Sequence, residues 1–326
     1  MKQCGATETT IEVVLQPEGN VERAQSLAAH LGLPLRIEEP LGSKAQSKRE
    51  PNKATRNNTR RDEKLSSSKE TALQLRFSSR GLALAQENME LALDFNDMQK
   101  RIQPGKLQRE LLVRAAKIKR AATCEHPLTA IDTTAGLGQD SFLLAAAGFN
   151  VVMFERDPII AALLGDALAR ACSSANETTA AIANRMTLLE GDSITELNAF
   201  ASLNTPASRD TSALPNSSPS FDAASLPQSS FSIDPSTLLK NRPDVVYLDP
   251  MFPERSKSAA VKKKFQLLHH LEKPCQDAEA LLEAALKMRP HKIIIKRPAK
   301  GPYLANTNPS YSLKGKTIRY DCIVLP

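Results

Sequence analysis

The chain has 326 residues, of which 41% are hydrophobic and 24% charged, and its formal net charge is +7 at pH 7. A chain of this length can bury its own core, and no apolar run reaches the roughly 20 residues that cross a bilayer. The N-terminus also lacks the pattern of a signal peptide, so we expect a cytoplasmic protein. The positive charge is compatible with a polyanionic partner but does not establish one.

The five cysteines are widely spaced, and none lies in a Cys-x-x-Cys pair. Such spacing predicts neither a zinc site nor a disulfide framework. We therefore expect reduced thiols without a chemical role, and no metal.

The N-terminal region predicts a small α/β module over residues 1–41. Apolar runs at 11–15 and 33–37 have the character of strands and flank a helical pattern at 21–31. Residues 42–70 then hold nine basic and four acidic side chains with almost no apolar ones. That composition predicts a basic disordered linker.

A further N-terminal extension is expected over 71–124. Within it, residues 100–120 hold eight basic side chains against the single acid Glu110, with leucine and alanine at helical spacing. This pattern predicts an amphipathic helix with a basic outer face. An ordinary solvated face explains the same pattern, so a role in binding nucleic acid depends on the neighbouring domain.

Strand and helix patterns alternate over residues 125–326, which predicts a doubly wound, Rossmann-like α/β domain with a parallel sheet. The predicted strands are 129–133, 151–155, 186–190, 245–248, 292–296 and 317–324, and the predicted helices are 140–147, 158–172, 259–271 and 277–287. A tract rich in Ser, Pro, Asn and Ala at about 203–236 interrupts the alternation and predicts a surface insertion.

The first predicted strand of this domain leads into a glycine turn and then a helix. Gly136 and Gly138 in that turn would let the backbone approach a nucleotide closely. Asp132 ends the strand, and Glu155 ends the next one, where an acid can bind ribose hydroxyls. A nucleotide-type cofactor at this edge of the sheet is the interpretation we favour over acids that merely cap a helix.

The helix that follows the glycine turn disfavours a phosphate. Asp140 and Ser141 stand near the helix start where a dinucleotide site would carry its third glycine, and the acid would repel an anion. S-adenosylmethionine has no phosphate and carries a sulfonium and an amino group that acids attract. After the third strand, Asp192 and Ser193 can hydrogen bond to an adenine amine.

The fourth strand, 245–248, delivers the sequence Asp-Pro-Met-Phe-Pro to the same edge of the sheet. Methylation of an exocyclic amine requires its nitrogen lone pair to point at the methyl carbon, which hydrogen-bond acceptors can enforce. Asp249 and the Pro250 carbonyl are suitable acceptors, and Phe252 can stack on a flat base. A proline-rich turn after a buried strand, with Phe252 in the core, is the alternative.

Taken together, these residues closely resemble the ribosomal RNA small subunit methyltransferase J family over roughly residues 125–326. The matching motifs are DTTAGLG at 132–138, FERDP at 154–158, VVYLDPMFP at 245–253, KSAAVKK at 257–263, KRP at 296–298 and LAN at 304–306. The resemblance implies a class I S-adenosylmethionine-dependent methyltransferase that methylates the N2 amine of a guanine in 16S rRNA. The implied partner is the rRNA, either naked or in the small ribosomal subunit.

By position, the resemblance places contacts with the methyl donor, S-adenosylmethionine, on Gln139, Asp140, Glu155, Arg156, Asp192, Ser193 and Asp249. Asp132, Gly136 and Gly138 are further candidates for the same cofactor site. Gln139 stands where an arginine is usual, and Asp192 where a serine is usual. Phosphate contacts position RNA without reading its sequence. The candidates for them are Lys262, Lys263, Lys264, Lys296, Arg297, Lys314, Lys316 and Arg319, together with the 100–120 region.

Several alternatives stay open at this point. A methyltransferase of the same fold could act on another RNA, on DNA adenine or on a protein amide, because the Asp249 loop suits any planar amine. An RNA-binding relative without catalysis is a second possibility, although the intact Gly136 and Glu155 argue against it. A nicotinamide dehydrogenase shares the glycine turn but is disfavoured by Ser141 and by the Asp249 loop.

Overall fold

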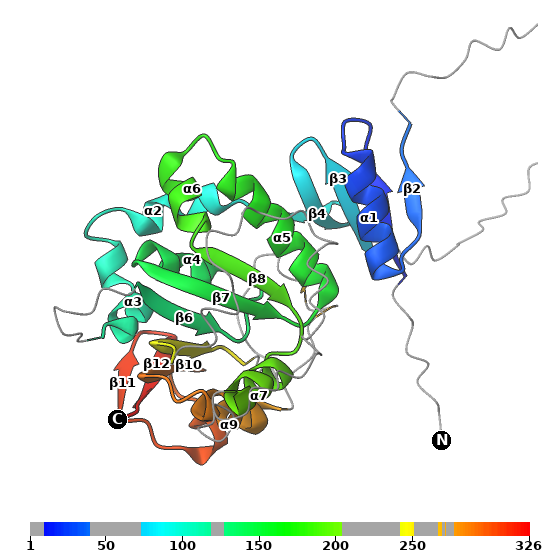
Figure 1. Ribbon diagram of the computed structural model, residues 1–326. Helices are drawn as coiled ribbons and strands as arrows, with labels where there is room; N and C mark the ends of the chain where they lie inside the picture. Colours follow the sequence, from blue (N-terminus) through cyan, green and yellow to red (C-terminus); the bar gives the residue numbers. More distant parts are fainter. Residues whose placement is uncertain are drawn as a thin grey trace, which may run out of the picture.

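The computed structural model describes residues 10–39, 73–118, 127–203, 242–250, 267–268, 271 and 277–326. They form two sheets, one of five strands and one of seven, and Figure 1 shows helix α5 between them. The predicted linker 42–70, nearly all of the 203–236 tract, Phe252 and most of the expected helix 259–271 lie outside the described residues.

The N-terminal sheet joins residues from both sides of the predicted linker. Its elements are β1 (Ile11–Leu15), α1 (Val21–Leu31), β2 (Leu35–Ile37), β3 (Leu73–Ser78), β4 (Gly81–Gln86) and β5 (Met89–Ala92). The strand order is β2-β1-β3-β4-β5, and β3 pairs in parallel with β1. The expected module boundary at residue 41 therefore falls between strands β1 and β3, which pair within one sheet. Two strands can pair whatever the length of the segment that joins them.

The basic segment that follows is a series of short helical turns. These are η1 (Phe95–Met98), α2 (Gln99–Ile102), η2 (Leu107–Arg109) and α3 (Leu111–Ala116). Pro104 lacks an N–H group and disfavours helical geometry at Gln103, which is extended, while Gly105 has a φ of +77°. The prediction of a single amphipathic helix over 100–120 is therefore wrong, although several of its basic side chains are exposed.

The seven-stranded sheet has the order β11-β12-β10-β9-β6-β7-β8. Its strands are β6 (Leu128–Asp132), β7 (Phe149–Glu155), β8 (Met186–Glu190), β9 (Val245–Leu248), β10 (Lys292–Pro298), β11 (Tyr311–Lys314) and β12 (Ile318–Val324). Strand β12 pairs antiparallel with β10 and with β11, and the other pairs among these strands are parallel. Counted along the chain from β6, the order is 3-2-1-4-5-7-6, which confirms the predicted doubly wound sheet and puts its switch point between β6 and β9.

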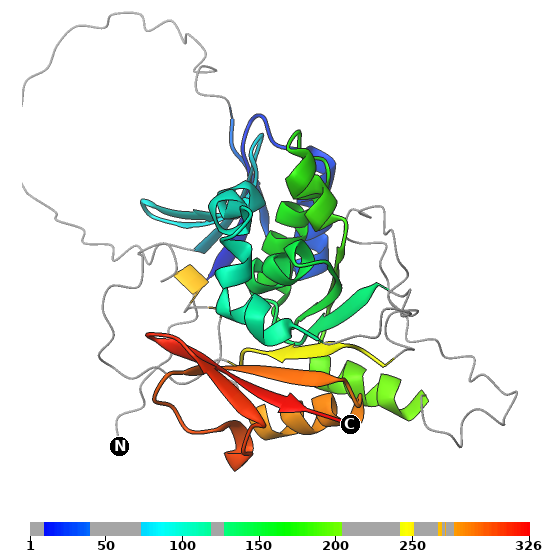
Figure 2. The ribbon, with the colours of Figure 1, turned by 90° about the vertical axis from the view of Figure 1, so that its left-hand side faces the viewer.

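Helices cover both faces of this sheet, as Figure 2 shows. The helices are α4 (Gln139–Ala146), α5 (Pro158–Cys172), α6 (Glu177–Ala183), α7 (Ser193–Leu203) and α9 (Ala278–Lys287), and η5 (Leu304–Asn306) is a single turn. Alternate strand residues enter opposite cores: Val151 and Met153 pack with α4 and α5, whereas Val152 packs with α7 and α9. None of the helices in the described ranges combines the length and apolar character needed to cross a membrane.

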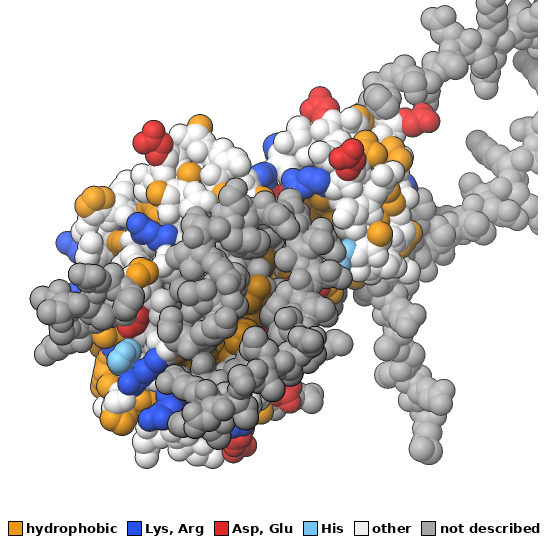
Figure 3. Space-filling view, viewed as in Figure 1, with side chains coloured by type: hydrophobic (Ala, Val, Ile, Leu, Met, Phe, Trp, Pro, Cys, Tyr) orange, Lys and Arg blue, Asp and Glu red, His pale blue; other side chains and the backbone are white. Residues whose placement is uncertain are grey.

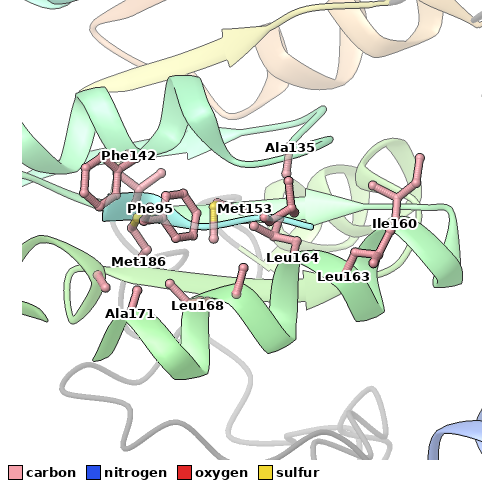
Figure 4. Packing of buried hydrophobic residues seen from close by; sticks show 14 of the residues in the cluster. Phe95, Ala135, Phe142, Met153, Ile160, Leu163, Leu164, Leu168, Ala171 and Met186 are labelled. Carbon is pink, nitrogen blue, oxygen red and sulfur yellow. The ribbon is translucent and has the colours of Figure 1, made fainter. Parts of the chain in front are cut away.

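The core beneath the glycine turn is closely packed. Phe95 from η1 stacks on Phe142 of α4 with ring centroids 4.9 Å apart, and Leu164 of α5 lies beside them (Figure 4). Both aromatic rings and Leu164 are almost fully buried. The N-terminal segment thus completes the core on which α4 and its preceding turn rest.

Candidate functional site

A cavity of about 1010 Å³ lies beyond the carboxyl ends of the parallel strands, at the switch point of the sheet. Its described lining includes ten residues predicted from the sequence: Asp132, Gly136, Gln139, Asp140, Glu155, Arg156, Asp192, Ser193, Asp249 and Pro250. The sheet thus brings these residues, which are spread over more than a hundred positions of the chain, to one place.

The glycine turn depends on backbone conformations that favour glycine. Gly136 has a φ of +52°, and Gly138, immediately before α4, has a φ of +70°. A Cβ atom on Gly138 would stand 2.6 Å from Leu164 Cδ1 and 3.2 Å from Phe95 Cζ. Gly138 therefore lets the turn lie against the core, whereas Gly136 lines the cavity.

We expect Gly138→Ala to lower the free energy of unfolding by about 2 to 5 kcal/mol. Roughly 1 to 2 kcal/mol comes from the left-handed backbone and the remainder from overpacking against Leu164. Gly105→Ala is the matched control, because Gly105 has a φ of +77° but no atom within 4 Å of the added Cβ. Urea unfolding of both variants measures the difference, and equal losses would contradict the packing argument.

Asp132 supports the turn from below. Its side chain is 1% exposed, with Oδ1 accepting from the Thr134 N–H and Oδ2 accepting from the Ser141 hydroxyl. Burial raises the pKa of Asp132 to about 7, although these hydrogen bonds oppose the rise. Asp132 therefore fixes the start of α4 relative to the end of β6.

Glu155 joins the end of β7 to the glycine turn. Its Oε2 accepts from the Gly136 N–H at 2.8 Å, and its Oε1 accepts from the Asp157 N–H at 2.8 Å. Burial raises the pKa of Glu155, and the backbone hydrogen bonds oppose this rise. A carboxylate oxygen accepts more than one hydrogen bond, so Glu155 can also receive hydroxyl donors from the cavity.

The remaining predicted donor contacts differ in how firmly they are held. Asp192 Oδ2 accepts from both the N–H and the hydroxyl of Thr195 at the start of α7, and Ser193 is buried. Gln139 is exposed, and Arg156 is an exposed side chain 3.8 Å from Asp277. The end of β8 therefore offers polar groups to the cavity, and Gln139 and Arg156 lie exposed on its lining.

Asp249 lies between the glycine turn and β10. Its backbone N–H donates to the Thr134 hydroxyl at 2.8 Å, which sets where β9 ends relative to the turn. Its Oδ2 accepts from Lys296 Nζ at 2.7 Å, and the same ammonium group donates to Asp140 Oδ2 at 2.8 Å. The predicted acceptor-side and donor-side carboxylates are thus joined by one lysine.

Tyr247 is a member of the site that the sequence analysis missed. Its hydroxyl donates to Asp140 Oδ2 at 2.7 Å, and its ring is buried beneath the cavity. The available signal was a hydroxyl-bearing side chain in an otherwise aliphatic strand, two residues before Asp249.

Two of the predicted RNA contacts are buried, and a third lines the cavity. Arg297 and Arg319 are 3% and 5% exposed, and Arg319 donates to Asp321 and to the carbonyls of Pro298, Ala299, Gly301 and Pro302. Lys296 lines the cavity. Burial therefore argues against phosphate contacts by Arg297 and Arg319, and Lys296 donates to Asp140 and Asp249 in the cavity. Lys314 and Lys316 are exposed, and Lys262, Lys263 and Lys264 lie outside the described residues.

The cavity is strongly acidic. Its described lining holds seven carboxylate side chains, Asp132, Asp140, Glu155, Asp157, Asp192, Asp249 and Asp277, against two cationic ones, Arg156 and Lys296. This balance attracts a cationic ligand and opposes a polyphosphate. In the described ranges, no group of three or more His, Cys, Asp or Glu side chains is placed to hold a metal ion.

Comparisons with known proteins agree with this geometry. A family model described as "Putative SAM-dependent methyltransferase" matches residues 59–207 and 227–325. Proteins named ribosomal RNA small subunit methyltransferase J are similar to the chain. The one from Stutzerimonas stutzeri is 40% identical over 59% of this chain and 58% of its own length, and the one from Marinobacter nauticus is 38% identical over 65% and 61%. The similarity thus spans about three fifths of these relatives and confirms the resemblance seen in the sequence.

A solved structure extends the likeness to nearly the whole fold. The crystal structure of a SAM-dependent methyltransferase from Neisseria gonorrhoeae aligns with a TM-score of 0.58. The alignment covers 96% of each chain at 23% sequence identity, and it includes the N-terminal part. At that identity the comparison supports the fold and not the substrate.

Proposed function

Because the chain belongs to this family of SAM-dependent methyltransferases, we propose that it methylates the exocyclic N2 amine of a guanine in 16S rRNA of the small ribosomal subunit. The observation that carries the proposal is the position of Asp249 and Pro250 on the wall of the acidic cavity. The names of the similar proteins support the choice of substrate.

The residues of the cavity fit S-adenosylmethionine. Asp140 and Asp249 offer carboxylates to a cation, Glu155 offers oxygens to ribose hydroxyls, and Asp192 with Ser193 offers hydrogen-bonding groups to adenine. Asp140 in the first turn of α4 opposes a phosphate at that helix end. When bound, this cofactor supplies an electrophilic methyl group bonded to a sulfonium.

On the acceptor side, the chain's own groups orient the amine. Asp249 and the Pro250 carbonyl are the acceptors we assign to the amine N–H groups, which turns the nitrogen lone pair towards the methyl carbon. Once the nitrogen has taken the methyl group that a bound donor would supply, Asp249 or water would accept the surplus amine proton. Catalysis on this account depends on positioning and electrostatics rather than on a strong base. The target guanine must leave its stack to reach the cavity.

Exposed basic groups next to the cavity suit the approach of RNA. Lys296 on β10, Tyr320 on β12 and Leu313 on β11 lie side by side in register, so Leu313, which precedes Lys314, lies two strand spacings or roughly 10 Å from Lys296. Gly315 in the turn with Lys314 and Lys316 packs on Leu111 of α3, which places the turn beside the basic 99–117 segment. Figure 3 shows described Lys and Arg side chains in several separate groups on the face that it views. We assign the sheet edge at this turn to RNA because the turn lies beside the basic 99–117 segment.

The double variant Lys314→Ser/Lys316→Ser should weaken the salt dependence of RNA binding. Loss of two phosphate contacts reduces the slope of log affinity against log salt by about 1.4 to 1.8 in magnitude. Lys287→Ser, an exposed lysine on α9, is the control and should leave the slope unchanged. Binding titrations at several salt concentrations measure the slope; an unchanged slope in the double variant would exclude this turn from the RNA interface.

Nucleoside analysis of 16S rRNA tests the proposed substrate in cells. RNA from cells with the gene should contain one N2-methylguanosine that RNA from cells without it lacks. Identical nucleoside profiles would overturn the assignment to 16S rRNA.

A further inference from the structure

Lys296 occupies a place that neither RNA binding nor the orientation of the amine requires. Its ammonium group lies 2.8 Å from Asp140 Oδ2 and 2.7 Å from Asp249 Oδ2. Asp140 belongs to α4 on the donor side, whereas Asp249 follows β9 on the acceptor side. The Lys296 side chain is 26% exposed, and β10 holds its backbone in the sheet. One cation from the fifth strand of the sheet thus connects both halves of the cavity.

The hydrogen bonds of these two carboxylates fall on one oxygen each. Asp140 Oδ2 accepts from Lys296 and from the Tyr247 hydroxyl, and Asp249 Oδ2 accepts from Lys296. Within the described part of the chain, Oδ1 of Asp140 and Oδ1 of Asp249 accept no hydrogen bond. Both side chains line the cavity, so each carboxylate is held by one oxygen and retains the other as an acceptor.

We propose that Lys296 is a positioning residue that clamps Asp140 and Asp249 through their Oδ2 atoms. The clamp leaves Oδ1 of Asp140 free for the cationic methyl donor and Oδ1 of Asp249 free for the amine N–H of the methyl acceptor. The proposal rests on the proposed function for the identity of those ligands. The clamp itself is a property of the protein alone. It also makes the acceptor carboxylate sensitive to the donor-side carboxylate, since both share one cation.

The charged groups around the clamp determine in which direction Lys296 and Asp140 shift the pKa of Asp249. Burial raises the pKa of Asp249, the Lys296 ammonium lowers it, and Asp140 raises it. Burial lowers the pKa of Lys296, but Asp140 and Asp249 together bring it above its ordinary value, so the lysine stays charged. The other groups that face the clamp are Tyr247 on β9, Tyr320 on β12, Asp132 on β6 and Arg101 on α2.

Carboxyl titration tests the clamp without substrate. In protein labelled with ¹³C at its Asp carboxyl groups, NMR follows the Asp249 signal, which Asp249→Asn identifies. Lys296→Met should raise the titration midpoint of Asp249 by about one to three pH units, because the opposite charge is lost. Asp140→Asn should lower the midpoint, because a like charge is lost.

Lys300→Met is the matched control, since Lys300 is an exposed lysine on the loop after β10 and should leave the midpoint where it is. Opposite shifts in the two clamp variants support the proposal. A midpoint of Asp249 that stays unchanged in both variants overturns it. If Lys296→Met does not fold, Asp140→Asn still tests the proposal, because the titration midpoint of Asp249 must fall in that variant.

Activity provides the second readout. An ionised Asp249 accepts the amine N–H, so the pH profile of methyl transfer by Lys296→Met should shift to higher pH than that of wild type, with activity lost on the acid side and recovered as the pH rises. A merely structural role for Lys296 would reduce the amount of folded enzyme without moving the midpoint of the pH profile. If wild-type protein does not methylate rRNA while the carboxyl shifts are seen, the proposed substrate fails and the clamp stands.

Discussion

Asp249→Ala should lower kcat for methyl transfer by about 10²- to 10³-fold while changing donor affinity by less than about tenfold. The carboxylate is held at the cavity wall by Lys296 and by the Thr134 hydroxyl that receives its backbone N–H. A preorganised hydrogen-bond partner of this kind acts on the transition state, and its removal costs about 3 to 4 kcal/mol. Glu155 and Asp192 lie at other strand ends and continue to bind the donor.

Single-turnover kinetics and calorimetric titration with the donor separate these two effects. Asp277→Ala is the matched control, because Asp277 also lines the cavity but is 57% exposed at the rim. Its kcat should stay within a few fold of wild type. A loss of donor affinity in Asp249→Ala with kcat at saturating donor unchanged would instead place Asp249 in donor binding only.

Arg319→Met should lower the free energy of unfolding by about 3 to 5 kcal/mol. Arg319 and Asp321 form an ion pair at 2.9 Å whose side chains are only 6% and 3% exposed. Loss of the arginine leaves a buried carboxylate without its cation, and loses the hydrogen bonds to four carbonyls between Pro298 and Pro302. The loop after β10 should loosen together with β12.

Urea unfolding measures this loss, with Lys314→Met as the control. Lys314 lies on the same hairpin but is exposed, so its replacement should change stability by less than about 0.5 kcal/mol. A loss of stability in Arg319→Met no larger than in the control would show that Arg319 is not buried, and would return it to the candidates for RNA contact.

Local sequence signals predicted much of the fold. Helix α5 was predicted with the bounds that the structure has, because Asp157 caps its N-terminus and Pro158 follows at the first helical position. Helix α1 was equally clear, between the cap Asn20 and the left-handed Gly32. Strand and helix patterns alternate on both sides of the glycine turn, and this alternation predicts the doubly wound sheet.

The pairing of distant segments was not visible in the same way. Nothing local to β3 indicates that it pairs with β1 rather than with strands of the main sheet, since both are short apolar runs. Pro104 and Gly105 interrupt the helix expected over 100–120, but the periodic leucines around them favour a continuous helix when the sequence is considered alone. Propensity and periodicity describe single elements, whereas a shared sheet is a tertiary property.

In the candidate site, too, residues with local sequence signals were predicted, whereas those that depend on tertiary contacts were not. Acids and glycines at strand ends were identified because all parallel strands end at one edge of a sheet, so Asp132, Glu155 and Asp249 meet around the cavity. The basic residues were harder, because the partner of a lysine or arginine depends on strand register. Arg297 and Arg319 face each other across β10 and β12, which the sequence alone does not reveal.

Transfer of labelled methyl groups from S-adenosylmethionine to 16S rRNA and to small subunits, both from cells that lack the gene, tests the central claim most directly. Wild-type protein should label one guanine as N2-methylguanosine, and Asp249→Ala should leave it essentially unlabelled. Parallel reactions with DNA and with protein substrates should stay unlabelled. Absence of label in both RNA substrates, with donor binding intact by calorimetry, would contradict the account and point to a different methyl acceptor.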